Sequence, residues 1–510
     1  MPQRDIEKVF LRIVKIGLWV IPFLPLYVSS SMLFPFITGK NFMFRIIVGA
    51  IFVFWVGLVV ARPEYRPKLT SLFKAATIFI VILFLADLFS PNPYRAFFSN
   101  YERMEGFMMH LHLYFYFVML ISVFKERRDW LIFFHTTLLA SLVVGLIGLW
   151  QWFGFQVSLQ GGFRIDSTIG NPTYLAAYLF FHVWMLLLLL HRFWQNWWLR
   201  IFYGAAFFFE LFIIYLTATR GATLAILLGF IVLLAFSLIF WKRIFPTVSF
   251  LRPWAGAAFF LLLLLPLFFW SVRDTQFVKS NQVLSRTTTI SLADRTTQAR
   301  FSIWKMSARA VLERPILGWG QENYYLVFQK YFDPKLYSSE PWFDRSHNIF
   351  LDWLIHAGVA GLLGFFSMIA VALWGIVRGM RKATVSLWEG AVIFTLFLVY
   401  FLQNIFVFDN LNTYLLFYGF LGHSAFLVDF SQNTSRDMTI GARASVAKVI
   451  SAIGIIVFLL GGYFLHWKPM REANALIRAL SSYQQKISLP QIQNAFREAL
   501  AFNTFGDTEV

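Results

Sequence analysis

The sequence predicts an all-α membrane protein, a polytopic transmembrane bundle of about 12–13 spans with a large, partly helical extracytoplasmic loop and a short C-terminal helical tail. First, 58% of the 510 residues are hydrophobic and only 14% are charged, whereas soluble domains carry about 25% charged residues. Second, apolar runs of about 20 residues, the length of a membrane-spanning helix, recur along the chain. Third, one long polar interval, 271–347, interrupts these runs. Together they exclude an ordinary soluble domain.

Each apolar run is expected to cross the bilayer as a helix, because backbone polar groups in the hydrocarbon region must bond within their own segment. The first run shows no small-residue cleavage site before Phe34-Pro35, which predicts a retained first span. The spans are expected near 13–36, 43–61, 70–89, 106–124, 130–152, 172–191, 198–217, 221–241, 254–271, 347–377, 388–408, 411–429 and 445–466.

Basic residues set the expected orientation. With a cytoplasmic N-terminus, about 22 Lys and Arg fall in inner segments and about 6 in short outer ones, as the positive-inside rule requires. The loop 272–346, the site and the C-terminus then face outward from the plasma (inner) membrane. The net charge of +18 is spread over these short clusters, so nucleic acid is not an expected partner. Zero Cys excludes disulfides, thiolate metal sites and a Cys nucleophile.

Two segments outside the spans have a character of their own. The polar interval holds eleven Lys or Arg against seven Asp or Glu, and Arg300 to Ala310 has an amphipathic helical pattern. A basic loop anchored to the bilayer at both ends indicates a site for an anionic ligand at the membrane surface. Residues 467–510, after a transmembrane domain 1–466, predict two short antiparallel helices, either the start of a helical-repeat (TPR-like) region or a hairpin on the membrane.

The outer arginines are the first candidates for a site. Arg103 stands at the mouth of the fourth span, Arg164 precedes the sixth, and Arg220 lies in a turn that leaves almost no loop. Such a guanidinium is costly there unless it pairs or faces water, although an interfacial arginine can also extend to lipid headgroups. Arg300 and Arg345 add to the set from the long loop. The planar fork of arginine bonds two oxygens at once, so converging arginines predict a diphosphate site.

His347 lies at the boundary of a predicted span, follows the polar residues Asp344 to Ser346 and precedes Asn348. Imidazole is the usual general base near neutral pH, and a hydroxyl acceptor needs such a base to become a nucleophile. The alternative is a structural role, in which Asp344, Ser346 or Asn348 caps the following helix. Spacing alone leaves both open.

Asp409 lies at the outer end of one span and just before the next. It can pair with an outer arginine, orient His347 or cap the following helix; the first is favoured because intramembrane acids usually have a charged partner. The sequence holds no Gly-rich phosphate loop, Asp-x-Asp pair or convincing set of metal-ligating histidines. We therefore expect no metal and no cofactor.

Four segments resemble a known family. His347-Asn348 is followed after nine residues by Gly358 and after two more by Gly361. Thr219-Arg220-Gly221 opens a helix, Arg300 to Trp304 leads into Pro-Ile-Leu-Gly-Trp-Gly at 315–320, and Gly-Asn-Pro at 170–172 precedes Tyr-Leu-Ala. In order and topology they resemble the bacterial O-antigen ligase and polymerase superfamily of polytopic membrane glycosyltransferases.

The resemblance implies that a glycan carried on undecaprenyl diphosphate is moved to an acceptor hydroxyl at the outer face. Arg220 and Arg300 would bind the diphosphate, His347 would activate or position the acceptor, and Asp409 would support the site. The reaction implied is a direct, metal-independent, inverting displacement, helped by fixed arginines that stabilise the leaving group. Around these four residues, Arg103, Arg164, Arg345 and Asn348 are expected to bind substrate.

Two features depart from the simplest ligase pattern, namely an extra span and the repeat-like tail. They leave open whether the acceptor is a lipid, a second glycan, as in a polymerase, or a protein, as in an O-linked oligosaccharyltransferase. A transporter of anionic lipid or polysaccharide is the alternative from another class. Transporters place ionisable groups near mid-membrane, whereas Arg220, Arg300, His347 and Asp409 all map to the outer edge.

Overall fold

The chain folds as a bundle of long helices. The computed structural model describes residues 3–158, 162–288, 294–337, 342–429, 444–484 and 488–509, and within these ranges no strand occurs. In the same ranges, twelve helices are long and apolar enough to cross a membrane, and α5 (Phe107–Val123) is a shorter apolar helix. The all-α polytopic fold is thereby confirmed, and the protein is a multi-pass membrane protein.

The elements follow one another in the predicted order. The membrane helices are α1 (Gln3–Val20, continued by η1 Ile21–Leu26), α2 (Thr38–Ala61), α3 (Ser71–Leu88), α5, α6 (Arg127–Trp152), α7 (Pro172–Arg192), α8 (Trp197–Leu216), α9 (Arg220–Ile239), α11 (Arg252–Val272), α16 (Ile349–Arg381), α17 (Leu387–Asn404), α18 (Leu411–Asp429) and α19 (Ala444–Gly462). The shorter elements are η2 (Pro63–Tyr65), α4 (Pro93–Phe98), η3 (Ser167–Ile169), α10 (Trp241–Ile244), η4 (Pro246–Leu251), α12 (Gln276–Ser280), α13 (Gln282–Thr288), α14 (Arg295–Glu313), α15 (Tyr324–Lys330), η5 (Pro334–Leu336), η7 (Tyr463–Trp467), α20 (Lys468–Gln484), α21 (Leu489–Leu500) and η8 (Phe505–Glu509).

The first span differs from its predicted position of 13–36. The membrane helix runs over Glu7–Leu26, and its last six residues form a 3₁₀ turn. Pro22 and Pro25 lie in this turn. Because proline has no N–H to donate and its ring opposes the preceding turn, the helix tightens and ends there instead of continuing to Phe34.

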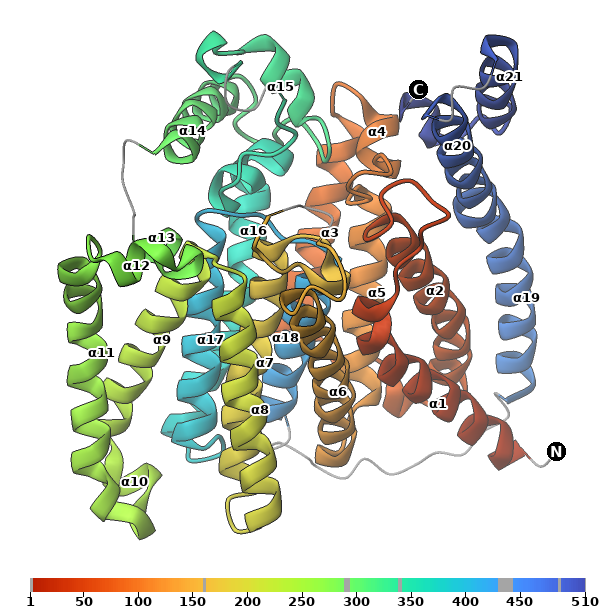
Figure 1. Ribbon diagram of the computed structural model, residues 1–510. Coiled ribbons are helices and arrows are strands. Elements are labelled where there is room, and N and C mark those ends of the chain that lie inside the picture. The colour runs from red at the N-terminus through yellow and green to blue at the C-terminus, as the bar shows by residue number, and fades with distance from the viewer. Residues whose placement is uncertain are drawn as a thin grey trace.

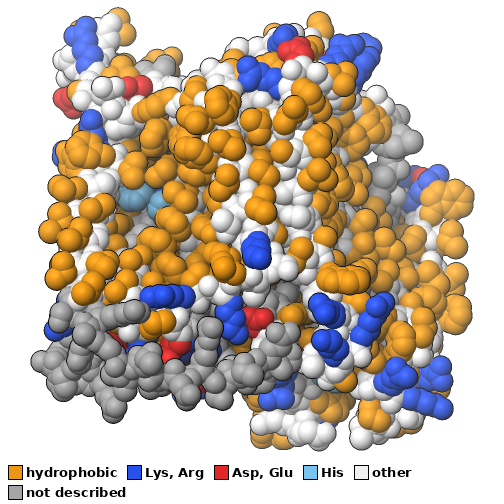
Figure 2. All heavy atoms as spheres, turned by 180° about the vertical axis from the view of Figure 1, so that it is seen from behind, with side chains coloured by type: hydrophobic (Ala, Val, Ile, Leu, Met, Phe, Trp, Pro, Cys, Tyr) orange, Lys and Arg blue, Asp and Glu red, His pale blue; other side chains and the backbone are white. Residues whose placement is uncertain are grey.

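The helices pack around a buried centre. Among the described membrane helices, α7 and α18 are the most buried, whereas α11 is not buried at all. Helix α16 packs on α3 and α18, α17 packs on α9 and α7, and α11 contacts α9 at the edge of the bundle (Figure 1). Figure 2 shows a broad belt of hydrophobic side chains on one face, with Lys and Arg gathered below it. That distribution is typical of a bundle surrounded by lipid.

The polar segments gather at one end of the bundle. Helices α14 and α15 lie there together with α4 and the C-terminus, while α10 lies at the opposite end (Figure 1). The amphipathic helix expected around Arg300 is α14. In the tail, α20 packs on α21, and Ala473, Ala479 and Ala499 are buried. The π-helical turn η7 joins α19 directly to α20, so the helix continues past residue 467.

Candidate functional site

The candidate site lies at the end of the bundle that carries α14. In the turn between α17 and α18 (405–410, hereafter the aromatic turn), the rings of Phe406 and Phe408 contact several of the predicted site residues. Phe408 lies 5.0 Å from the His347 ring and 5.0 Å from the guanidinium of Arg103. Phe406 lies 5.8 Å from the guanidinium of Arg300. Three segments far apart in sequence therefore meet at one short turn.

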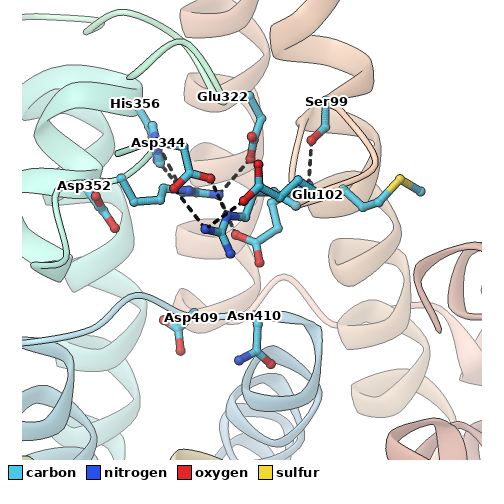
Figure 3. Close-up of polar contacts among 12 residues, drawn as sticks. Ser99, Glu102, Glu322, Asp344, Asp352, His356, Asp409 and Asn410 are labelled. Carbon is cyan, nitrogen blue, oxygen red and sulfur yellow. Dashed lines mark hydrogen bonds and ion pairs between the residues drawn. The ribbon is translucent and has the colours of Figure 1, made fainter. Parts of the chain in front are cut away.

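A network of ion pairs forms one half of the site (Figure 3). Arg103 binds both carboxylate oxygens of Asp344. Arg345, only 3% exposed, pairs with Glu105 at 2.5 Å and with Glu322 at 2.8 Å. The guanidiniums of this ion-pair network are thus matched by carboxylates from separate segments.

The ion-pair partners determine the charge states of Asp344 and Arg345. Burial raises the pKa of Asp344, but Arg103 and Arg345 outweigh burial and bring it down to about 2. Burial lowers the pKa of Arg345, and Glu322 and Glu105 more than reverse that effect. Both groups are therefore charged at neutral pH, and Arg345 holds the 342–348 segment against the turn that carries Glu105.

The other half of the site contains Arg164, Arg220 and Arg286, hereafter the arginine group, and few carboxylates. Arg164 donates from Nε to the Thr217 carbonyl at 2.8 Å and from Nη2 to Thr219 Oγ1 at 3.1 Å. Arg220 donates from Nε to the carbonyl of Arg286 at 2.6 Å. Among the described residues, the one ion pair in this arginine group joins Arg220 to Asp294 at 3.5 Å, with both side chains partly exposed.

Repulsion acts within the arginine group. Burial lowers the pKa of Arg164 to about 10, and the positive charges of Arg286 and Arg220 add to the effect. The pKa of Arg286 is lowered by burial and then by Arg220, with Asp294 opposing. Three guanidinium groups that repel one another form a site that favours binding of an anion.

His347 stands beside the ion-pair network. Its backbone has a positive φ of 53°, and its ring packs edge-on to Phe343 and Phe408. Burial lowers the pKa of His347, and nearby Arg300 lowers it further against the opposing charge of Asp344, to about 3. In the described part of the chain, neither ring nitrogen has a hydrogen-bond partner. The imidazole is neutral and partly exposed.

Asn348 takes the capping role that the sequence left open. Its Oδ1 accepts hydrogen bonds from the backbone N–H groups of Phe350 and Leu351 at the start of α16. Its Nδ2 donates to the carbonyl of Ile405 at 3.2 Å. Asn348 therefore ties the beginning of α16 to the aromatic turn and fixes His347 beside it.

Asp409 is buried at the end of the aromatic turn, below the ion-pair network in Figure 3. It accepts hydrogen bonds from Tyr400, Asn404 and Thr413. Burial raises its pKa to about 6 despite these donors. In the described residues its partners are hydroxyl and amide groups, so the favoured pairing with an outer arginine is wrong. The reason is that the outer carboxylates Asp344, Glu105 and Glu322 already neutralise the nearest guanidiniums.

A break in α16 accounts for the glycines of the His-Asn-x9-Gly-x2-Gly pattern. Gly358 has φ 64° and ψ −163°, a backbone that side chains strongly disfavour. The 315–320 segment fills the break: Trp319 N donates to Ile355 O at 2.6 Å, and Val359 N donates to Pro315 O at 2.8 Å. A Cβ on Gly358 would collide with the Ile316 carbonyl. Two motifs that are separate in sequence thus form one hydrogen-bonded unit between α14 and α16.

The structure adds residues that sequence reasoning missed. Phe406 and Phe408 alternate just before the polar pair Asp409-Asn410, and this spacing is the sequence signal that would have identified them. Glu105 and Glu322 gave no local signal, because their partner Arg345 is remote in the chain. Lys40 and Arg45 are among the basic residues of the short outer segments that were used only to predict the orientation in the membrane, yet both side chains are almost completely buried. No group of three His, Asp or Glu suited to a metal ion occurs among the described residues.

Residues 204–366 match the model of a family described as O-antigen ligase. The matched segment contains Arg220, Arg300, His347, Gly358 and Gly361, and it confirms the resemblance to the O-antigen ligase superfamily. A search of curated proteins found no match.

Proposed function

From the match of residues 204–366 to the O-antigen ligase family, we propose that the protein acts as a member of that superfamily and transfers a glycan from undecaprenyl diphosphate to an acceptor hydroxyl at the extracytoplasmic face of the inner membrane. The superfamily has a membrane glycan-transfer function, which implies a bilayer and glycan substrates. The observation that carries the finer proposal is the meeting of Arg103, Arg300 and His347 at the aromatic turn, next to the arginine group.

The diphosphate is assigned to the arginine side of the site. Arg164, Arg220 and Arg286 repel one another and have one carboxylate, Asp294, among the described residues. A diphosphate supplies the missing negative charge and several acceptor oxygens, which arginine bonds in pairs. Arg300, which lies near Phe406 and lowers the pKa of His347, is assigned to the phosphate nearest the sugar. These cations replace the divalent metal that many diphosphate enzymes use.

His347 is assigned to the acceptor. The acceptor oxygen forms a bond to the anomeric carbon while the bond from that carbon to the diphosphate oxygen breaks on the opposite face, which inverts the anomeric configuration. The hydroxyl proton passes to a ring nitrogen of His347, and the arginines stabilise the charge that develops on the leaving diphosphate.

His347 is suited to this role as a neutral ring. Burial, and then Arg300, lower the pKa of His347 to about 3, so the imidazole is neutral at physiological pH and can accept a proton. A bound diphosphate offsets the part of this shift that comes from Arg300, which strengthens the base, whereas the part that comes from burial remains. Asp409 keeps the aromatic turn in place through its three hydrogen bonds.

The experiment is transfer by purified protein in proteoliposomes. The protein is incubated without added metal with an undecaprenyl-diphosphate glycan and candidate lipid, glycan and protein acceptors, and products are identified by mass. Arg220→Ala, Arg300→Ala and His347→Ala are each expected to abolish transfer while the protein stays inserted. Arg309→Ala is the matched control, because Arg309 is an exposed arginine on the same helix as Arg300.

The proposal fails if His347→Ala transfers at the wild-type rate, or if no acceptor receives glycan while labelled lipid crosses the bilayer, which would indicate a transporter. The mass of the product distinguishes a ligase from a polymerase or an O-linked oligosaccharyltransferase of the same superfamily. Inversion is read from the anomeric configuration of the product by NMR.

A further inference from the structure

A cavity lies at the opposite end of the bundle from the candidate site, where the last turns of α16 and α18 meet the first turn of α3. Its volume is about 260 Å³. About 10–15 Å³ of such space holds one water, so the cavity has room for on the order of 20 waters, enough for a phosphate group and its glycerol. Its lining shares no residue with the ion-pair network or the arginine group, so the cavity is a separate place in the molecule.

One face of α16 changes from apolar to basic along this cavity. Val371, Trp374, Arg378 and Lys382 line it, and because they are three or four positions apart they form one stripe along the helix. At a rise of about 1.5 Å per residue, Arg378 lies about 6 Å beyond Trp374 along the axis and Lys382 about 12 Å beyond it. This is the order in which a lipid molecule presents an acyl chain and then a headgroup.

Arg378 and Lys382 bring positive charge to the cavity. In the described part of the chain, neither side chain forms an ion pair. The one acidic residue in the described lining is Asp429, whose Oδ2 lies 3.8 Å from Nζ of Lys68. Basic residues are common where a membrane helix ends at the surface, but here open space adjoins them. That space can hold the counter-charge that the two cations lack.

A neighbouring cavity of about 150 Å³ extends the basic surroundings. Thr70, Ala425 and Asp429 line both cavities. In the described linings of the two cavities together, five basic residues accompany two acidic ones, namely Arg66, Lys68, Lys125, Arg378 and Lys382 with Glu64 and Asp429. The excess of positive charge favours an anionic ligand over a neutral one.

The remaining wall of the first cavity is apolar. Leu72, Ala425 and Val428 contribute to it, and Trp374 is 63% exposed beside them. Tryptophan is frequent at the level of lipid headgroups, because its ring is apolar and its indole N–H is polar. A soluble anion would use only the basic end of this cavity, whereas a lipid would use the basic end and the apolar wall.

We propose that this cavity binds an anionic phospholipid, with its phosphate on Arg378 and Lys382 and the first part of an acyl chain against Trp374 and Val371. Basic pockets between membrane helices are suited to anionic lipid headgroups. By the positive-inside rule this end of the bundle faces the cytoplasm, so the lipid belongs to the inner leaflet. The lipid fills the space between the ends of α3, α16 and α18. The inference does not depend on the proposed glycan transfer.

The test is photo-crosslinking of the full-length protein in nanodiscs of phosphatidylcholine. The probe is a phosphatidylglycerol with a diazirine near the carboxyl end of one acyl chain, and the same diazirine on phosphatidylcholine is the neutral match. Crosslinked peptides are identified by mass spectrometry after digestion with pepsin, which does not cleave at Lys or Arg. The anionic probe is expected to label residues 371–379, with a yield at least about tenfold higher than that of the neutral probe. Unlabelled phosphatidylglycerol should displace the anionic probe, whereas sn-glycerol 3-phosphate should not.

The variant that tests the basic end combines Arg378→Gln with Lys382→Gln. Labelling of residues 371–379 should fall by about tenfold, because two cations that attract the phosphate are gone. The matched control combines Lys242→Gln with Arg243→Gln. It removes the same two charges from exposed positions on α10, which lies at the same end of the bundle and outside the cavity (Figure 1). The control should be labelled like the wild type.

Four results overturn the proposal: equal labelling by the neutral probe, labelling confined to other segments, unchanged labelling in the double variant at Arg378 and Lys382, or displacement of the probe by glycerol 3-phosphate, which would make the cavity a site for a soluble phosphate. If that double variant does not fold, Trp374→Ala serves instead. It removes the exposed apolar ring and is expected to reduce labelling severalfold, and unchanged labelling in Trp374→Ala also overturns the proposal.

Discussion

The ion-pair network and the arginine group lie at the same end of the bundle, but they handle positive charge in opposite ways. Arg345 is buried between Glu105 and Glu322, and Arg103 is bound to Asp344. Arg164, Arg220 and Arg286 have one carboxylate, Asp294, among the described residues, and burial and then neighbouring guanidiniums lower the pKa of Arg164 and of Arg286. The paired charges of the ion-pair network hold segments of the chain together, whereas the unpaired positive charges of the arginine group favour binding of an anion. The difference separates residues that build the site from residues expected to bind substrate.

The largest effect is expected for Arg345→Met, which leaves Glu105 and Glu322 buried without a counter-charge. Breaking a buried pair in this way costs about 3–5 kcal/mol. The midpoint of thermal unfolding in detergent should fall strongly, and the triple variant that adds Glu105→Gln and Glu322→Gln should recover most of it. Wild-type stability in Arg345→Met would place Arg345 with the binding residues instead.

Arg220→Ala tests the other side of the comparison. Transfer should fall by at least about 10²–10³-fold, the usual result of removing one group that stabilises transition-state charge, which leaves no product in the mass assay. Stability should change little, because Arg220 is partly exposed and pairs weakly with Asp294. Initial rates in proteoliposomes and unfolding midpoints should be measured on the same preparation. A large loss of stability with an unchanged rate per folded molecule would mean that the arginine group is structural.

Asp294→Asn sharpens the comparison by removing the carboxylate that opposes the arginine group. Partly exposed ion pairs contribute about 0.2–1 kcal/mol, so pyrophosphate binding should tighten by a few-fold at most. Titration calorimetry at low salt gives the affinity, and the gain should shrink as salt is added because exposed charges are screened. Weaker binding would show that Asp294 orders Arg220 rather than competing for it.

The smallest effect concerns pH. Burial and then Arg300 lower the pKa of His347 to about 3, below the value of about 6.5 for an unfolded histidine. The native state therefore binds fewer protons than the unfolded state between these values, so His347 destabilises the fold at low pH and this penalty fades as the pH rises across that window. The profile of kcat/KM, which reports the free enzyme, should change less than twofold from pH 5.5 to 7.5. A limb near pH 6.5 in the wild-type profile would contradict this expectation.

Much of the fold follows from local sequence. Runs of about 20 apolar residues place the membrane helices, and α14 appears where the amphipathic pattern predicts it. These features depend on neighbouring residues and on the thickness of a bilayer. The first span shows the limit of this reasoning, because hydropathy continues past Leu26 although two prolines have already ended the regular helix.

The site was harder to predict because its contacts are long-range. Arg345 and Glu105 are 240 positions apart, and Arg103 and Asp344 are 241 apart. Residue type alone did not distinguish an arginine that is neutralised from one that is not, so Arg103, Arg220 and Arg345 looked equivalent in the sequence. The same reason hid Lys40, whose position suggested a loop charge although folding buries it against Thr168.

The break in α16 makes the spacing between the motif residues a matter of angular phase. The turns from Asn348 to Gly358 are pinned below by the 315–320 segment and above by the Asn348 bond to Ile405. One inserted residue would rotate the upper end by about 100° and shift it by about 1.5 Å, turning Asn348 away from Ile405 and His347 away from Phe408. An insertion in the surrounding loops would leave the orientation of the imidazole unchanged. An insertion between Asn348 and Gly358 would change it.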